Sequence, residues 1–398
     1  MSSLTGKSLN PVMNRRSVIA SAAGLGAMSI LAGCSSNGGD SGSASGDASF
    51  KIGTIGPLTG ANASYGKSVT QAVELGCKDF STKELPLVSK AEDDQADGEK
   101  AVNAFNTLLD WGMQALVGPT TTGASVAVAA ECGNDPETFM ITPSASSEDV
   151  TKGKDCVFQV CFTDPNQGVA SADYIADNKL GTKVGVIYDS SVAYSSGIYE
   201  KFKAEADAKG LEIVAAEAFT ADNKSDLSTQ VAKCQQAGAD LVFLPIYYQE
   251  ASQILIAANK SGYEPVFFGC DGMDGILDVE GFDTSLAEGL MLLTPFAADA
   301  QDEKTQAFVS AYVAAYGETP NQFAADAYDA IYAIKAAMEE ADITPETSVS
   351  DTCDKMKEAM LKIKVNGLTG EDMTWTEDGE PHKAPKAVKV VDGAYQAM

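Results

Sequence analysis

Several hydroxyl side chains stand where a small anion would be bound, directly after predicted strands. Thr121 and Thr122 follow one apolar run and open a predicted helix, while Ser144 and Ser146 follow the next run along the chain. Free backbone N–H groups and the positive end of the helix dipole favour a negative charge at a helix start. These four residues therefore form a candidate site for a carboxylate.

One acid and three tyrosines at other strand ends suit the cationic end of a ligand. Asp271 is the first acid after its predicted strand, and Tyr65, Tyr194 and Tyr247 supply flat aromatic walls that attract a cation. The same residues also fit structural roles, with Thr121 as a helix cap, Asp271 in an Asx turn, and Tyr65 and Tyr247 as half-buried aromatics. The sequence leaves both interpretations open.

Hydrolysis and metal binding have little support in the sequence. The chain has a single histidine, His382, in a polar turn, and it has no C-x-x-C pair. A zinc site or a Cys/His nucleophile needs more ligands or partners than this. The segment from Gly60 to Ser68 resembles a phosphate-binding loop, but its glycines are spaced too widely. We therefore predict a protein that is not an enzyme and that has no metal or cofactor.

The charge balance limits the partners. The 398 residues include 28 basic and 56 acidic side chains, which gives a formal net charge of −28. Such a surface repels nucleic-acid phosphates and anionic lipid headgroups, so neither is an expected partner by charge. A large net charge also keeps a protein soluble, and we expect a monomer.

The first residues resemble an export signal. Paired arginines precede an apolar run over 17–32, which is short for a membrane span and suits a signal-peptide core. The run ends in Leu-Ala-Gly-Cys, which resembles the lipobox of bacterial lipoproteins and makes Cys34 the expected lipidation site. We predict a signal peptide over 1–33 and a flexible tether over 34–49. Export would follow either the general or the twin-arginine route. The protein would then be extracytoplasmic and held to the cell membrane by its lipid.

Seven cysteines follow Cys34, which leaves at least one thiol unpaired in an exported protein. Cys132 and Cys156 bracket one short strand and are a candidate disulfide pair. The sequence does not decide whether they pair.

From residue 50 onwards, short apolar runs alternate with helical stretches, which predicts parallel sheets covered on both faces. The first set of strands lies at 50–56, 85–94, 113–119 and 137–143. The second set starts at 156–162 and continues at 183–189, 211–219, 239–245 and 264–269. Two such sets predict an α/β fold with two doubly wound parallel-sheet lobes.

The last third reads as three helices, over 302–316, 321–341 and 349–361, and two extended pieces, over 371–377 and 386–393. These are too few strands for a third sheet, so we expect them to complete both lobes through a hinge of three crossovers. The predicted N-terminal lobe is 50–165 plus 296–368, and the predicted C-terminal lobe is 166–295 plus 369–398.

Motifs at successive strand ends resemble the type I periplasmic solute-binding proteins of ABC importers, in the leucine/isoleucine/valine-binding branch. In chain order they are GPLTG with a following YG (56–66), EDD (92–94), VGPTTTG (117–123), ITPSAS (141–146), FTDPNQG (162–168), YD with YSSG (188–197), Tyr247 and GCDG (269–272). Each motif is weak alone, but the ordered set covers most of the chain.

The resemblance implies a hinged pair of lobes that close on an amino acid held in the cleft. It implies that Asp271 receives the α-ammonium, that Ser146 supplies a hydroxyl for the carboxylate, and that Phe323 contacts the ligand side chain, although Phe323 also fits a core position. It implies delivery of a branched-chain or similar aliphatic amino acid to the transmembrane subunits of an ABC permease. The alternatives are a ligand-sensing ectodomain and a binding protein for an amide, urea or another small carboxylate.

Overall fold

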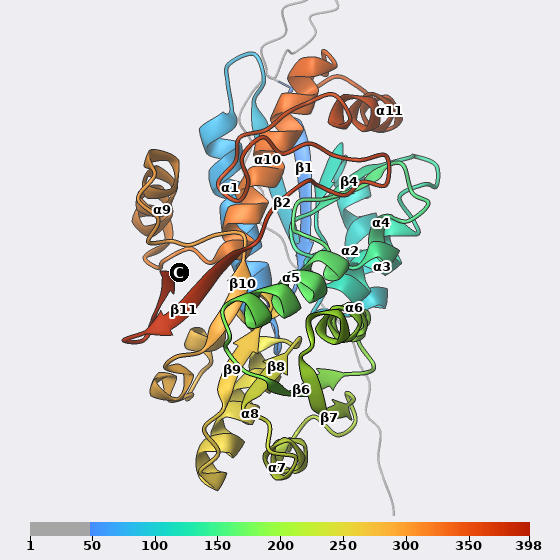
Figure 1. The fold of residues 1–398 in the computed structure, drawn as a ribbon. Helices are drawn as coiled ribbons and strands as arrows, with labels where there is room; N and C mark the ends of the chain where they lie inside the picture. Colours follow the sequence, from blue (N-terminus) through green and yellow to red (C-terminus); the bar gives the residue numbers. More distant parts are fainter. Residues whose placement is uncertain (1–47) are drawn as a thin grey trace, which may run out of the picture. The chain divides into compact units, whose positions relative to one another are not determined.

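The computed structural model describes residues 48–398 and contains two β-sheets with helices packed against them (Figure 1). The first sheet is parallel and has the order β2-β1-β3-β4-β5. The second sheet has the order β12-β11-β10-β9-β8-β6-β7, in which β11 runs antiparallel to both of its neighbours, β10 and β12, and the other pairs are parallel. The predicted α/β class with doubly wound parallel sheets is confirmed.

The first sheet and its helices come mainly from the first third of the chain. Its strands are β1 (Phe50–Gly56), β2 (Leu87–Asp93), β3 (Ala115–Val117), β4 (Phe139–Thr142) and β5 (Val157–Gln159), and its connecting helices are α1 (Ala63–Phe80), α2 (Gly98–Trp111), α3 (Thr122–Ala129) and α4 (Glu148–Thr151). The strands β3, β4 and β5 are buried at every residue. Burial on both faces explains why they read as continuous apolar runs.

The second sheet follows in the same alternating pattern. Its strands are β6 (Lys183–Asp189), β7 (Glu212–Phe219), β8 (Leu241–Leu244), β9 (Val266–Gly269), β10 (Met291–Thr294), β11 (Lys386–Val391) and β12 (Ala394–Ala397). Its helices are α5 (Asp164–Asp177), α6 (Ala193–Lys209), α7 (Ser228–Gln236) and α8 (Tyr248–Ser261), and short 3₁₀ turns follow β9 at Asp271–Met273, Ile276–Asp278 and Thr284–Ala287.

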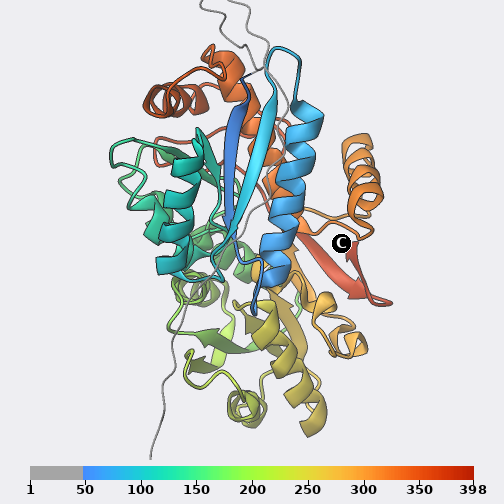
Figure 2. The same cartoon turned by 180° about the vertical axis from the view of Figure 1, so that it is seen from behind.

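The three predicted late helices form as α9 (Glu303–Tyr316), α10 (Gln322–Glu340) and α11 (Val349–Met360). They return to the first sheet, where α10 lies along α1 and α11 contacts β3 and β4 (Figures 1 and 2). The chain then runs back to β11 in the second sheet. It thus passes between the sheets three times, after β5, after β10 and before β11.

Three details of the sequence prediction are wrong. The run at 156–162 does not start the second sheet, because β5 pairs with β4 as the edge strand of the first. The strand β10 was not predicted. The extended piece at 371–377 forms no strand and makes isolated bridges, Val365 with Met373 and Trp375 with Pro381.

We propose the two predicted lobes with one adjustment near residue 369. The indole Nε1 of Trp375 donates to the Gln159 carbonyl at 2.7 Å, and the Gln159 N–H donates to the Gly379 carbonyl at 2.9 Å. Since Gln159 ends β5, the segment up to about Lys383 is bonded to the first sheet. We therefore place residues 369–383 in the N-terminal lobe.

The predicted signal peptide over 1–33, the lipidated Cys34 and nearly all of the tether lie outside the described residues. Within residues 48–398, no helix combines the length and the apolarity that a bilayer crossing requires.

Candidate ligand-binding site

The nine predicted ligand-binding residues all follow the carboxyl ends of strands or open helices beside them. Ligands of open α/β sheets bind at this edge. Those of the first sheet come from α1, the start of α3, the loop after β4 and the start of α10. Those of the second sheet come from α6, the residue before α8 and the turn after β9. They are Tyr65, Thr121, Thr122, Ser144, Ser146, Phe323, Tyr194, Tyr247 and Asp271.

Asp271 is buried and fully hydrogen-bonded by the protein. It is 3% exposed, the Tyr194 hydroxyl donates to its Oδ1 at 2.7 Å, and Gln167 Nε2 donates to its Oδ2 at 2.9 Å. Burial raises the pKa of Asp271 to about 7, although the hydrogen bonds from Tyr194, Gly272 and Gln167 oppose this rise. Its predicted contact with a ligand ammonium stays a prediction, and an ammonium would add to these two donors.

Four aromatic residues bring the two sheets together. The Tyr65 ring packs edge-on against Tyr247 at 5.7 Å between centroids and against Phe323 at 4.4 Å, and Tyr247 stacks on Tyr194 at 5.1 Å. The Tyr65 hydroxyl donates to the carbonyl of Gly272. Tyr65 and Phe323 belong to helices of the first sheet, whereas Tyr194 and Tyr247 belong to the second. These aromatic contacts span both sheets, and their role as a wall for a ligand stays a prediction.

The hydroxyls differ in how they are used. The side-chain oxygens of Thr121 and Ser146 are buried and have no hydrogen-bond partner among residues 48–398. Thr121 occupies the N-cap position of α3, yet its side chain makes no capping bond, and Thr122 follows as the buried first residue. Ser144 donates to the carbonyl of Thr120 at 2.6 Å. Thr121 and Ser146 are thus the hydroxyls left with unused hydrogen-bonding capacity.

A second buried acid, Asp164, was not singled out by the sequence analysis. It is 2% exposed, and neither carboxyl oxygen has a hydrogen-bond partner in the part of the chain described. Burial raises the pKa of Asp164 well above its usual range, the neighbouring Ser146 hydroxyl opposes the rise, and the charge of Asp271 adds to it. Its backbone N–H donates to the Ser146 carbonyl at 2.9 Å, which fixes the acid beside that hydroxyl.

The signal for Asp164 was present in FTDPNQG, which was interpreted only as a crossover segment. Asp164 is the first residue of α5, directly after the crossing from the first sheet. An acid at the first turn of a helix is commonplace because it complements the helix dipole. Gln167, one turn later, donates a hydrogen bond to the Asp271 carboxylate, and the sequence analysis did not single it out either.

A cavity of about 510 Å³ opens between residues of the two sheets. Asn62, Gln95 and Thr121 line it from the first sheet, and Tyr194 and Tyr247 line it from the second. The other six predicted residues do not line this cavity, because contacts such as that between Tyr65 and Gly272 already fill the space between them with protein atoms. Asp164 and Ser147 line a neighbouring cavity of about 380 Å³.

A buried ion pair lies where the chain crosses between the sheets. The Lys383 ammonium donates to Asp326 Oδ1 at 2.5 Å and to the Val160 carbonyl at 2.9 Å, and the two charged side chains are 0% and 2% exposed. Lys383 thereby joins α10, the end of the first sheet and the last crossing segment.

The sequence model of the periplasmic binding proteins matches residues 49–394. The chain belongs to this family. Among relatives of this periplasmic binding protein, the Leu/Ile/Val-binding protein homolog 3 of Brucella melitensis is 30% identical over 306 residues, which are 76% of this chain and 82% of the relative.

Two solved structures extend the comparison. The substrate-binding protein LivJ of a branched-chain amino acid transporter from Streptococcus pneumoniae, in complex with isoleucine, has a TM-score of 0.79 and 25% identity, and the match covers 88% of this periplasmic binding protein and 98% of LivJ. A solute-binding protein of an ABC transporter from R. palustris, in complex with benzoate, has a TM-score of 0.77 and 18% identity over 88% and 95% of the two chains. The second shares the fold alone. The family places this chain outside the cytoplasm, among proteins that bind a substrate.

Proposed function

We propose that this protein is the substrate-binding lipoprotein of an ABC importer and that it binds an α-amino acid with a branched-chain or similar aliphatic side chain. One observation carries the proposal. Within residues 48–398, the buried hydroxyls of Thr121 and Ser146 and the buried carboxyl of Asp164 have no partner at hydrogen-bonding distance, and Asp164 lies beside Ser146 at the edge where ligands of this fold bind. Buried polar groups are nearly always paired, so the place of these three at the ligand-binding edge supports a ligand that pairs with them.

The two kinds of unpaired group match the two ends of a zwitterion. Thr121 stands at the start of α3, where the hydroxyl and the helix dipole favour a carboxylate. The carboxyls of Asp164 and Asp271 favour an ammonium, and a charge-assisted hydrogen bond is about twice as strong as a neutral one. The apolar rings of Tyr65 and Phe323 suit an aliphatic side chain.

The ligand would act by joining the two lobes. Groups that would hold its carboxylate lie on the first sheet, and the acid that follows β9 lies on the second. A ligand that contacts both lobes shifts the population towards the closed form by its difference in affinity for the two forms. The permease transmembrane subunits would then receive the closed, loaded monomer, which the lipid on Cys34 holds near them.

A second candidate is a small carboxylate that has no ammonium, such as the benzoate of the structural neighbour. The unpaired acid argues against it, because such a ligand would leave Asp164 without a partner and place a second negative charge nearby. An amide or urea would donate hydrogen bonds to Asp164 but would leave the helix start of α3 without an anion. A sensing ectodomain would use the same pocket and differ only in its partner.

Binding is tested by calorimetry and thermal shift of the purified protein with the twenty amino acids, urea, small amides and benzoate. A ligand at 100 times its Kd adds about 2.7 kcal/mol of stability. Stabilisation by leucine, isoleucine and valine is the expected result. Stabilisation by benzoate or urea alone would overturn the amino-acid assignment. The lipid anchor is tested by Cys34→Ala, which should release the protein into the medium, and continued membrane attachment would contradict the lipidation.

A further inference from the structure

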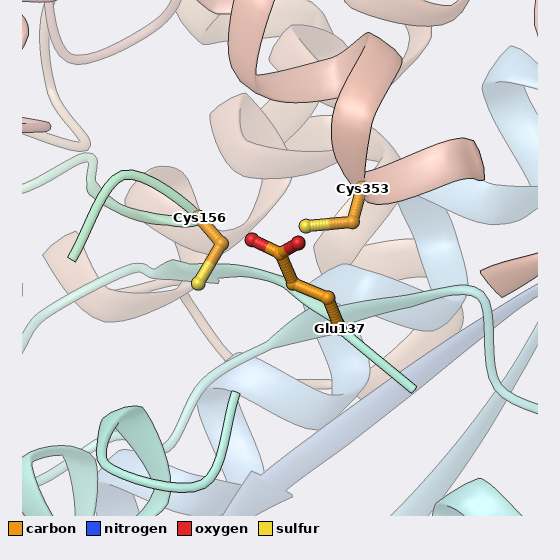
Figure 3. Close-up of side chains that lie close together, drawn as sticks. All are labelled: Glu137, Cys156 and Cys353. Atoms are coloured by element: carbon orange, nitrogen blue, oxygen red, sulfur yellow. The ribbon is translucent and has the colours of Figure 1, made fainter. Parts of the chain in front are cut away.

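Two cysteines far apart in the sequence lie together beneath the first sheet. Cys156 precedes β5 and Cys353 lies on α11, and Glu137, just before β4, stands beside them (Figure 3). The two sulfur atoms and a carboxyl oxygen of Glu137 all lie within 4.8 Å of one another. Both thiols are buried, at 2% and 0% exposure.

We propose that Cys156 and Cys353 form a disulfide in the exported protein. A disulfide bond is about 2.05 Å long, so the sulfur atoms have to approach one another from their present separation. Rotation of either side chain to its next staggered position about the Cα–Cβ bond moves the sulfur by about 3 Å. This displacement is of the same order as the separation of the sulfur atoms, which is at most 4.8 Å.

The carboxylate of Glu137, which stands between the sulfur atoms in the view of Figure 3, can give way. Its side chain is 31% exposed and is held by Lys357, whose ammonium lies 3.1 Å from Oε1 and also contacts Asp354 at 3.0 Å. The carboxylate can therefore turn towards solvent and keep this cation. Glu137 already has Lys357 as an ion-pair partner, so its carboxylate does not depend on the two thiols.

The family's extracytoplasmic location supplies the chemical conditions, since disulfides form and persist outside the cytoplasm. The pair that the sequence suggested, Cys132 with Cys156, is less well placed. The Cys132 sulfur lies 3.7 Å from the thioether sulfur of Met140, and Cys156 has Cys353 beside it. All seven cysteines of residues 48–398 are free thiols in the structure, so neither pair is bonded in it.

The reaction is a thiol–disulfide exchange with a small external disulfide or an exported dithiol oxidase. One cysteine, as thiolate, attacks a sulfur of the oxidant, which leaves as a thiolate and gives a mixed disulfide. The second cysteine loses its proton and attacks the protein sulfur of that mixed disulfide, which expels the other oxidant sulfur. Two protein thiols are oxidised, one external disulfide is reduced to two thiols, and the protons pass to those products. Because both cysteines are buried, the exchange takes place while the chain folds.

The bond would fasten α11 to the start of β5. The same strand runs on to the crossing segment and Asp164, so the covalent link would reach the edge of the ligand site through one short strand. It would also close the chain between residues 156 and 353, and long closed loops restrict the unfolded chain most.

The test is to denature the protein recovered from outside the cytoplasm and to alkylate its thiols with and without reductant. Among the seven cysteines of residues 48–398, five should react without reductant and all seven with it. Peptide mapping should recover one linked pair that contains Cys156 and Cys353. Reductant should also lower the Tm of the folded protein by several degrees.

Variants sharpen the result. Cys156→Ser should give six reactive thiols with or without reductant and should lose the effect of reductant on the Tm. Cys234→Ala, which removes a buried thiol on α7, should keep the linked peptide and the effect on the Tm.

Three outcomes would overturn the proposal, each on the untreated protein and independently of whether it binds a ligand. They are seven reactive thiols without reductant, a linked peptide that joins Cys132 to Cys156, and one equivalent of a bound metal ion such as zinc with both thiols reduced.

Discussion

Replacing Asp164 by asparagine separates a role in binding from a role in folding. The change removes the charge and keeps the shape of a side chain whose carboxyl oxygens have no partner within residues 48–398. An ammonium ligand would lose one charge-assisted hydrogen bond, which contributes about 1.5–3 kcal/mol. We therefore expect Asp164→Asn to raise the Kd for the amino acid by about 10-fold to 150-fold.

The stability of the ligand-free protein should change in the other direction or not at all. A buried ionised carboxyl without a partner is unfavourable, and asparagine has no ionised form to bury. The Tm of ligand-free Asp164→Asn should therefore equal or exceed that of the unmodified protein. A residue that served the fold alone would lower the Tm and leave affinity unchanged.

Calorimetry and thermal unfolding at neutral pH measure both quantities. Asp149→Asn is the matched control, because Asp149 lines the same 380 Å³ cavity as Asp164 but from an exposed position, where solvent and salt screen its charge. Its Kd should stay within about twofold of the original value. Unchanged affinity in Asp164→Asn, or an equal loss in the two variants, would refute the reasoning.

Three further predictions concern pH, the hydroxyls and the buried ion pair. Because burial raises the pKa of Asp271 to about 7, its protonated form stabilises the ligand-free fold at low pH and this stability is lost as pH rises from about 4 to about 7. An ammonium needs the ionised form, so affinity should rise over the same range. Between pH 5 and pH 8 the ligand-free Tm should therefore fall while the Kd also falls, and a Tm and an affinity that both rise or both fall would contradict this. Thr121→Val and Ser146→Ala should each weaken binding by about 0.5–1.5 kcal/mol in calorimetry without lowering the ligand-free Tm, and a lower Tm would mean that the hydroxyls serve the fold. Lys383→Met should lower the free energy of unfolding by about 3–5 kcal/mol in denaturant, because it leaves Asp326 buried without its cation. Adding Asp326→Asn should recover part of this loss. A loss below about 1 kcal/mol would contradict a stabilising role of the buried pair.

The fold was largely predictable because buried parallel strands leave a strong apolar signal. The errors arose where that signal does not specify a partner. The run at 156–162 is apolar whichever sheet it joins, and its pairing with β4 depends on contacts distant in the sequence. The strand β10 is a short apolar run bounded by the turn residues Gly289 and Pro295, and the sequence analysis overlooked it.

The candidate site was only partly predictable from the sequence. Residues at strand ends could be chosen, since the topology places those ends on one edge. Whether each polar group is hydrogen-bonded by the protein could not be predicted, because this depends on neighbours that are distant in the sequence. Asp271 and Asp164 are similar in sequence context, yet the protein supplies donors to both oxygens of the first and to neither oxygen of the second.

Two tyrosine hydroxyls join the two sheets directly. Tyr65 donates to the Gly272 carbonyl, and the Tyr248 hydroxyl donates to the Ala61 carbonyl at 2.8 Å. Each such contact reduces the work that a solute must do to bring the walls together, which favours capture from dilute surroundings. The same contacts would also favour the closed form when no solute is bound. In an importer, the closed protein without a solute could bind the permease and cause ATP hydrolysis without transport. Stronger contacts at Tyr65 and Tyr248 would therefore raise the affinity for the solute and lower the amount of solute transported per ATP.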